Sequence, residues 1–178
     1  MLTAHTQIEE IGMAETALRG NPVQTAGDLP AVGGQAPSFS LTGTDLAPVT
    51  SESLAGQRVV LNIFPSVDTP TCASSIRAFN ERAAALDNTT VLCVSADLPF
   101  AQGRFCGAEG IENVKTASTF KSSEFLQDYG VGMVDGPLEA LCARAVVVLD
   151  ESGNVVHQQL VAEIADEPDY DAAINALG

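Results

Sequence analysis

Three nearly continuous apolar segments constrain the fold of this chain more than any other feature of its sequence. They are VVLNIFP at 59–65, TTVLCVSAD at 89–97 and ARAVVVLD at 143–150. Such short apolar runs are typical of strands that are buried on both faces of a sheet. A fourth run, 154–161, alternates more between apolar and polar residues and follows the turn ESGN. The last two runs therefore predict an antiparallel pair at a sheet edge.

Helical patterns fill the spaces between these runs. The clearest lies at 70–86, where four apolar residues form one stripe: Ile76, Phe79, Ala83 and Leu86. The other predicted helices are 99–107, which Gly107 would end, 122–129, which Gly130 would cap, and a last helix that starts near Pro168. This order of strands and helices predicts an α/β sandwich with a mixed central sheet.

The segments before the first apolar run predict shorter elements. Residues 14–25 predict a hairpin, and residues 38–56 predict a second short strand pair with a helical turn. Residues 1–12 show no comparable pattern, and we expect them to form a disordered N-terminal extension. Residues 13–178 contain no linker, which predicts a single domain.

The charge of the chain argues against two classes of partner. It has 8 Lys and Arg against 23 Asp and Glu, a formal net charge of −15. Nucleic acids and anionic membranes are bound through clustered basic residues, so we expect neither as a partner. The N-terminus has neither the basic nor the apolar part of a secretory signal. We therefore expect a cytoplasmic protein whose thiols are kept reduced.

Cysteine and histidine spacing argues against a metal site. The four cysteines, at 72, 93, 106 and 142, form no CxxC pair, and His5 and His157 lie near opposite ends of the chain. Zinc sites usually have paired ligands a few residues apart, so we expect no metal and no cofactor. The same spacing leaves no histidine in a suitable place to activate a thiol.

Cys72 has the sequence context of a reactive thiol. Thr69 stands where a helix N-cap belongs and Pro70 at the first helical position, which places Cys72 in the first turn of the 70–86 helix. The unpaired N–H groups of a helix N-terminus carry partial positive charge and favour a thiolate over a thiol. The local geometry alone supports equally well a second interpretation, in which Cys72 is a small apolar residue packed under the first turn.

The residues around Cys72 resemble a known family. The pattern Pro65-x-x-x-Thr69-x-x-Cys72 matches the active-site motif of peroxiredoxins. The wider segments NIFPSVDTPTC, VLCVSADLPFAQGRFCGAEG and ARAVVVLDESGNV, in this order, closely resemble the thiol peroxidase branch of the atypical two-cysteine peroxiredoxins. The resemblance runs from about Gly20 to the C-terminal helix. It implies a thioredoxin-like three-layer sandwich with an added N-terminal β-hairpin.

The same resemblance implies roles for individual residues. Cys72 would be the peroxidatic cysteine, whose thiolate attacks the peroxide and becomes a sulfenic acid. Thr69 would orient the peroxide, Pro65 would shield the pocket from water, and Arg144 would stabilise the thiolate and the leaving oxygen. Structural alternatives stay open: Thr69 as a plain N-cap, Pro65 as a strand terminator and Arg144 as a solvated surface residue. Because Arg144 begins an apolar strand, we favour the functional role for it.

The resemblance also implies a second reactive thiol. Cys106, in RFCGAEG, matches the family's resolving position, where a thiol converts the sulfenic acid into an intramolecular disulfide. The alternative is a buried helical thiol. Because the two cysteines are predicted on different helices, we expect local unwinding around Cys72 and around Cys106, which Gly103 and Gly107 would ease. Thioredoxin is the reductant that the family implies.

The other two cysteines have structural interpretations. Cys93 lies in mid-strand between Val and Leu, and we expect a buried, inert thiol. Cys142 is expected mainly to pack, with a redox role as the lesser alternative. If the strand already runs at 142, Cys142 and Arg144 share a face, and the Cys142 thiol points toward the active-site side.

Three functions compete on the sequence alone. The leading one is a peroxidase for hydrogen peroxide and organic or lipid hydroperoxides, and the apolar residues Ile63, Phe64 and Val67 favour organic substrates. A general disulfide oxidoreductase would need the CxxC pair that is missing. A redox sensor would form the disulfide without turnover. The family further implies a homodimer, to which the sequence itself adds little.

Overall fold

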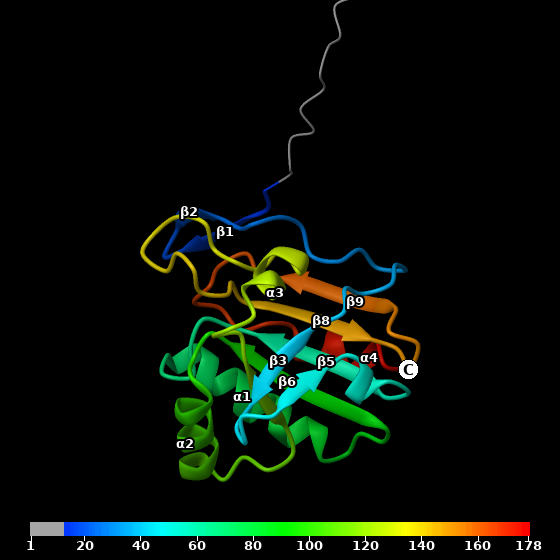
Figure 1. Cartoon of the computed structure of the whole chain (residues 1–178). Helices are drawn as coiled ribbons and strands as arrows, with labels where there is room; N and C mark the ends of the chain where they lie inside the picture. The colour runs from blue at the N-terminus through cyan, green and yellow to red at the C-terminus, as the bar shows by residue number, and fades with distance from the viewer. Residues whose placement is uncertain (1–12) are drawn as a thin grey trace, which may run out of the picture.

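The main sheet of the protein has seven strands. A computed structural model describes residues 13–178, and the strand order is β4-β3-β7-β6-β5-β8-β9 (Figure 1). Strands β5, β6 and β7 are parallel to one another, and the other neighbouring pairs are antiparallel, which confirms the mixed sheet and the β8–β9 pair at its edge. In chain order the strands are β3 (Ser40–Gly43), β4 (Pro48–Thr50), β5 (Arg58–Ile63), β6 (Thr89–Ser95), β7 (Lys115–Ser118), β8 (Ala145–Leu149) and β9 (Val155–Leu160).

Helices cover both faces of this sheet. They are α1 (Pro70–Ala83), α2 (Pro99–Glu109), α3 (Ser123–Asp128) and α4 (Tyr170–Asn175), with a short 3-10 turn at Glu52–Leu54. Phe79 of α1 packs with α4 on one face, and Phe125 of α3 packs on the other. The α2 helix lies beside α1, to which the ion pair Arg77–Glu109 joins it (Figure 1). The layers are those of the predicted sandwich.

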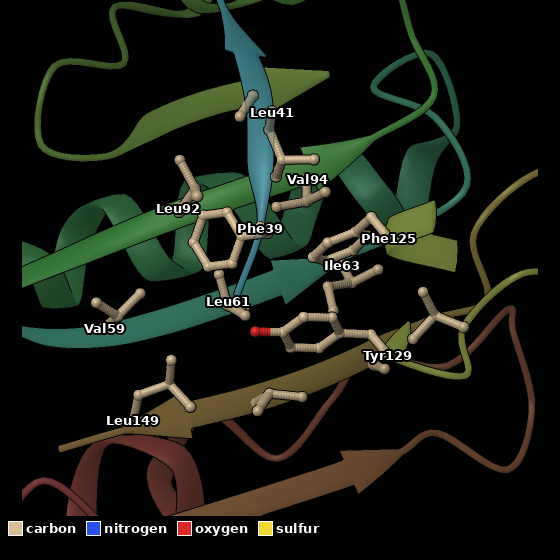
Figure 2. Close-up of a cluster of buried hydrophobic side chains, with 14 of the residues drawn as sticks. Phe39, Leu41, Val59, Leu61, Ile63, Leu92, Val94, Phe125, Tyr129 and Leu149 are labelled. Carbon is tan, nitrogen blue, oxygen red and sulfur yellow. The ribbon is translucent and has the colours of Figure 1, made fainter. Parts of the chain in front are cut away.

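The larger part of the core lies on the α3 face (Figure 2). The rings of Phe125 and Tyr129 stack with centroids 4.4 Å apart, and Phe39 meets Phe125 edge-on at 6.1 Å. The Tyr129 hydroxyl donates a hydrogen bond to the Pro37 carbonyl at 2.7 Å, so the polar end of this buried ring has a partner. Leu61 of the central strand β5 lies in the same cluster. This packing fixes one face of β5, the strand that leads into the loop before Cys72.

The N-terminal hairpin forms a small sheet of its own, as predicted. It consists of β1 (Glu15–Leu18) and β2 (Asn21–Gln24), and both residues of the turn, 19–20, have positive φ. A bridge between Ala17 and Glu163 ties the hairpin to the loop after β9. The hairpin therefore reaches the same end of the molecule as the C-terminal end of β5.

Helix ends differ from the sequence prediction in three places. The α2 helix continues through Gly107 to Glu109, and Gly110, with φ of 66°, is its C-cap. The α1 helix ends at Ala83, one turn before the predicted end. The α4 helix begins after Asp169, because the Asp169 carboxylate accepts the N–H of Ala172 and so makes a better cap than the preceding proline.

Strand β7 was not predicted. Its sequence, KTAS, is short and polar, so it has no apolar run to mark it. The predicted disordered extension, 1–12, lies outside the described residues, and the single domain over 13–178 stays a prediction. Within residues 13–178 no helix is long and apolar enough to cross a membrane.

Candidate active site

Cys72 lies in the first turn of α1, just beyond the end of the central strand β5. Thr69 is the N-cap of the helix, and its Oγ1 accepts a hydrogen bond from the N–H of Cys72 at 3.4 Å. Pro70 takes the first helical position, where a missing N–H costs nothing. The predicted helix start is therefore confirmed. The Cys72 side chain is fully buried beside Phe64 and other apolar residues.

Arg144 is the charged residue that reaches Cys72. Its Nη2 donates to the Cys72 Sγ at 3.2 Å, and its Nε donates to the carbonyl of Ile164 at 2.7 Å. The side chain is only 2% exposed, so the alternative of a solvated surface arginine is wrong. The Arg144 Nη1 is also buried and has no hydrogen-bond partner among residues 13–178. The guanidinium therefore brings a positive charge within hydrogen-bond distance of the Cys72 sulfur.

A cavity of about 610 Å³ opens beside these residues. Pro65, Thr69 and Arg144 lie in its lining, which brings three of the predicted site residues together beside Cys72. The rest of the lining is mixed: polar residues such as Arg19 and Asn21 lie there together with four apolar residues from loops and from the hairpin, Leu18, Pro137, Leu138 and Ile164. Sequence reasoning missed these four, because loop residues show no periodicity that would indicate where they face.

Cys106 lies on a different helix from Cys72. It belongs to α2 and, like the other three cysteines, is a free thiol. The side chain is half-buried, and this burial raises the pKa of the thiol, an effect that a hydrogen bond with Thr116 opposes. The structure therefore places the peroxidatic candidate, Cys72, behind the cavity-lining residues Thr69 and Arg144, and the resolving candidate on the neighbouring helix, with no bond between the two thiols.

The remaining cysteines are buried. Burial raises the pKa of both Cys93 and Cys142 to about 12, so both are neutral thiols at physiological pH. Strand β8 begins only at Ala145, so residue 142 does not lie in the strand. The prediction that Cys142 and Arg144 share a face depended on a strand that includes residue 142, and it therefore does not apply. Cys142 packs in the core cluster on the α3 face, whereas Arg144 reaches Cys72 on the α1 face.

Asp97 is a further polar residue near the site that sequence reasoning missed. Its carboxylate accepts hydrogen bonds from the N–H of Val67 at 2.9 Å, from Ser66 Oγ at 2.7 Å and from Ser95 Oγ at 2.6 Å. Asp97 follows β6, and Ser66 follows the parallel neighbour β5. A signal was present in the sequence, because the carboxyl ends of adjacent parallel strands meet at one edge of a sheet, where sites form in α/β proteins.

Known proteins resemble this chain over nearly its whole length. The family model described as Redoxin matches residues 31–174. The thiol peroxidase of Mycobacterium tuberculosis is 60% identical over 93% of this chain and 99% of its own length, and that of Corynebacterium glutamicum is 56% identical over 93% and 99%. The crystal structure of a peroxiredoxin-like protein from Aquifex aeolicus matches with a TM-score of 0.86 and 39% identity, covering 92% of this chain and 96% of that one. The predicted thioredoxin-like fold is thereby confirmed.

Proposed function

Because the chain belongs to the Redoxin family and, within it, to the thiol peroxidases, we propose that it reduces hydrogen peroxide and organic or lipid hydroperoxides through Cys72 and Cys106, with thioredoxin as its reductant. Membership makes the chain a peroxidase of the peroxiredoxin type. The observation that carries the proposed mechanism is the 3.2 Å contact between the buried Arg144 Nη2 and the Cys72 Sγ at a helix N-terminus.

The first step oxidises Cys72. The thiolate attacks the terminal oxygen of the hydroperoxide, an S–O bond forms, and the O–O bond breaks. The alkoxide that leaves takes up a proton, equivalent to the one that Cys72 lost on ionisation, so the products are an alcohol and the Cys72 sulfenic acid. The peroxide is reduced by two electrons, which the sulfur supplies.

The residues around the cavity support this step. Negative charge moves from sulfur to the leaving oxygen. The Arg144 Nη1 is buried and has no partner among the described residues, so it could donate a hydrogen bond to that oxygen. Thr69 is one of the residues that line the cavity, so its hydroxyl could orient the peroxide, and Pro65 presents no N–H that would hold water there. The apolar lining contributed by Leu18 and Leu138 favours organic hydroperoxides.

The second step forms the disulfide and then reduces it. The Cys106 sulfur attacks the Cys72 sulfenic acid, an S–S bond forms and water leaves. Because the two cysteines are free thiols on two different helices, we propose that the Cys72 turn and the segment around Cys106 unwind locally to form the bond. Thioredoxin, a dithiol, would restore both thiols by thiol–disulfide exchange and supply the two electrons.

We also propose that the enzyme is a cytoplasmic homodimer. Phe120 and Val134 are large apolar residues that are 47% and 39% exposed, and both line one surface cavity. Exposed apolar residues that gather in this way are typical of protein–protein contacts. Sedimentation of the reduced protein at several concentrations tests the dimer, and a monomer at all of them would refute it.

The test of the proposed function is stoichiometric. The reduced protein, freed of reductant, receives one equivalent of an organic hydroperoxide, and disulfides are mapped by peptide mass spectrometry. We expect a Cys72–Cys106 disulfide in the wild type and in the control variant Cys142→Ser. Neither Cys72→Ser nor Cys106→Ser should form it, and steady turnover with thioredoxin should require both cysteines.

The rival functions predict other results. A disulfide through Cys93 or Cys142, or no oxidation by equimolar peroxide, would contradict the assigned roles. Formation of the Cys72–Cys106 disulfide without turnover would indicate a redox sensor. Reduction of insulin disulfides at a useful rate would indicate a general disulfide oxidoreductase.

A further inference from the structure

We infer that Asp97 is a positioning residue that holds the Cys72 turn and helix α2 together in the arrangement that reacts with peroxide. The inference rests on the proposed function, since it assumes that a Cys72–Cys106 disulfide forms. It goes beyond that function in naming the hydrogen bonds that must break before the disulfide can form. We call this set, made of Ser66, Val67, Ser95, Asp97 and Gln102, the Asp97 network.

The loop side of the network fixes the chain that leads into the Cys72 turn. Asp97 Oδ2 accepts the N–H of Val67 at 2.9 Å, and Oδ1 accepts Ser66 Oγ at 2.7 Å. Ser66 Oγ in turn accepts the N–H of Asp68 at 3.2 Å, and the Ser66 carbonyl accepts the Thr69 hydroxyl at 3.3 Å. One carboxylate therefore orders the loop from β5 up to the cap of the Cys72 helix.

The helix side of the network reaches the helix that carries Cys106. Ser95 Oγ donates to Asp97 Oδ2 at 2.6 Å and accepts from Gln102 Nε2 at 3.0 Å. Gln102 Nε2 also donates to the carbonyl of Ala117 at 3.0 Å. Gln102 is fully buried, although it is a polar residue on a helix that is otherwise largely exposed. The same carboxylate thus connects the peroxidatic loop and the resolving helix.

Apart from these hydrogen bonds, helix α2 is held by the half-buried Phe105, which packs against the cluster around Cys72, and by the hydrogen bond between Cys106 and Thr116. Pro99 and Gln102 are its only buried residues. Its ion pairs with neighbouring segments, Arg104–Asp68 at 3.4 Å and Arg77–Glu109 at 2.8 Å, are exposed, and exposed pairs contribute little. The hydrogen bonds of Gln102 therefore make up most of the specific polar attachment of α2 to the sheet. Release of the Asp97 network would free both segments whose unwinding the disulfide needs.

The inference predicts opposite effects on the two chemical steps. Asp97→Ala removes the acceptor for three donors, so the Cys72 turn spends less time in the folded form. Hydrogen bonds to charged groups are among the stronger ones in proteins, so their loss should shift the balance between the folded and the unwound Cys72 turn. We therefore expect the second-order rate constant of Cys72 oxidation to fall about tenfold and the rate constant of disulfide formation to rise about tenfold. Asp97→Asn keeps an oxygen for Val67 and Ser95 and an amide N–H that can donate to Ser66, so it should restore most of both rates.

Variants on each side of the network separate its two connections. Ser66→Ala weakens the loop side and should reproduce the slower oxidation. Gln102→Met removes only the helix side, so disulfide formation should accelerate while Cys72 oxidation stays within about twofold of the wild type. Both variants keep the carboxylate, so they test the inference even if Asp97→Ala does not fold.

A matched control exists in the β8–β9 turn. Asp150 is partly buried like Asp97 and accepts the N–H groups of Ser152 and Asn154, both at 2.9 Å. Asp150→Ala should lower general stability without changing either chemical step.

The chain has no Trp, so rates are followed by rapid quenching, alkylation of free thiols and mass spectrometry after mixing with an organic hydroperoxide. Excess peroxide adds a further measurement, the fraction of Cys72 that becomes sulfinic acid, which should be lower in Asp97→Ala than in the wild type.

The outcomes separate failure of the inference from failure of the proposed function. If the wild type forms no Cys72–Cys106 disulfide, the proposed function fails. If the wild type forms it but Asp97→Ala leaves both rates unchanged, slows both, or behaves like Asp150→Ala, only the inference fails.

Discussion

The two cysteine-bearing helices begin alike and are held very differently. Both follow a parallel strand of the sheet, and both have a proline at the first helical position, Pro70 in α1 and Pro99 in α2. The cap of α1 is the Thr69 side chain, and five residues of α1 are buried. The cap of α2, Leu98, makes no side-chain hydrogen bond, and only two residues of α2 are buried.

This difference matches what the two thiols would have to do in the proposed mechanism. Reaction with peroxide requires a fixed geometry between Cys72, Arg144 and the cavity, which a capped and buried helix provides. Formation of a disulfide requires a thiol that can move, and local opening is easiest where few apolar contacts and few buried hydrogen bonds hold a segment. Firm attachment of α1 as a whole, with only its first turn required to open, and loose attachment of α2 therefore both fit the proposed mechanism.

The difference in attachment between α1 and α2 should have its largest effect on the free energy of unfolding. Phe79 of α1 is fully buried and meets the Tyr170 ring edge-on at 5.1 Å, so Phe79→Ala should lower the free energy of unfolding by about 3–5 kcal/mol. Phe105 of α2 is half-buried, so Phe105→Ala should cost only about 1 kcal/mol. Urea denaturation followed by circular dichroism measures both. Equal costs for the two substitutions would refute the contrast in attachment.

Arg144 tests the fixed geometry at Cys72. Arg144→Lys keeps the charge but cannot contact the sulfur and Ile164 and still offer a third nitrogen to the peroxide. We expect the rate of Cys72 oxidation to fall about 10²–10³-fold, the cost of losing one donor to a developing negative charge. Disulfide formation from preformed sulfenic acid should change much less. A variant that loses both steps equally would instead indicate general disruption of the fold.

Much of this contrast could be predicted from the sequence. The start of α1 follows from Thr69-Pro70 after an apolar run, because capping and proline geometry are local effects. The sequence favours a functional role for Arg144 over a solvated surface residue, because a guanidinium at the start of an apolar strand usually has a partner. Roles for Pro65, Thr69, Cys72, Cys106 and Arg144 came from the resemblance and remain predictions.

Other parts required three-dimensional information. Asp97 contacts the loop after β5 from a position 30 residues away, and no local pattern marks such a contact. No sequence pattern marks Gln102 as buried, because its burial depends on how α2 is placed over β6 and β7. The direction of the Cys142 side chain could be predicted only if residue 142 belonged to the strand, and β8 begins at Ala145.

Thr69 tests the cap of α1 separately from its hydroxyl chemistry. Thr69→Val keeps the shape of the side chain but removes the oxygen that accepts the Cys72 N–H, and loss of such a cap should lower stability by about 1 kcal/mol. A loss of 1 kcal/mol corresponds to a slowing of about fivefold. If the hydroxyl also orients the peroxide, Cys72 oxidation should slow by more than this. Thr69→Ser keeps the oxygen and serves as the control. A slowing of fivefold or less in Thr69→Val would leave Thr69 as a plain N-cap.

Gly107 offers the smallest effect and the most direct test of the loose attachment of α2. Neither of the two glycines in α2, Gly103 and Gly107, has a positive φ, and a Cβ at Gly107 would meet no atom within 4 Å. Packing therefore does not require glycine at Gly107, and Gly107→Ala should stabilise the protein by about 0.5–1 kcal/mol. If α2 must unwind to bring Cys106 to Cys72, that stabilisation should slow disulfide formation about two- to fivefold, while the rate of Cys72 oxidation stays unchanged. Rapid-quench measurement of the two steps separates them. A more stable variant that resolves as fast as the wild type would mean that α2 moves as a rigid helix rather than by unwinding.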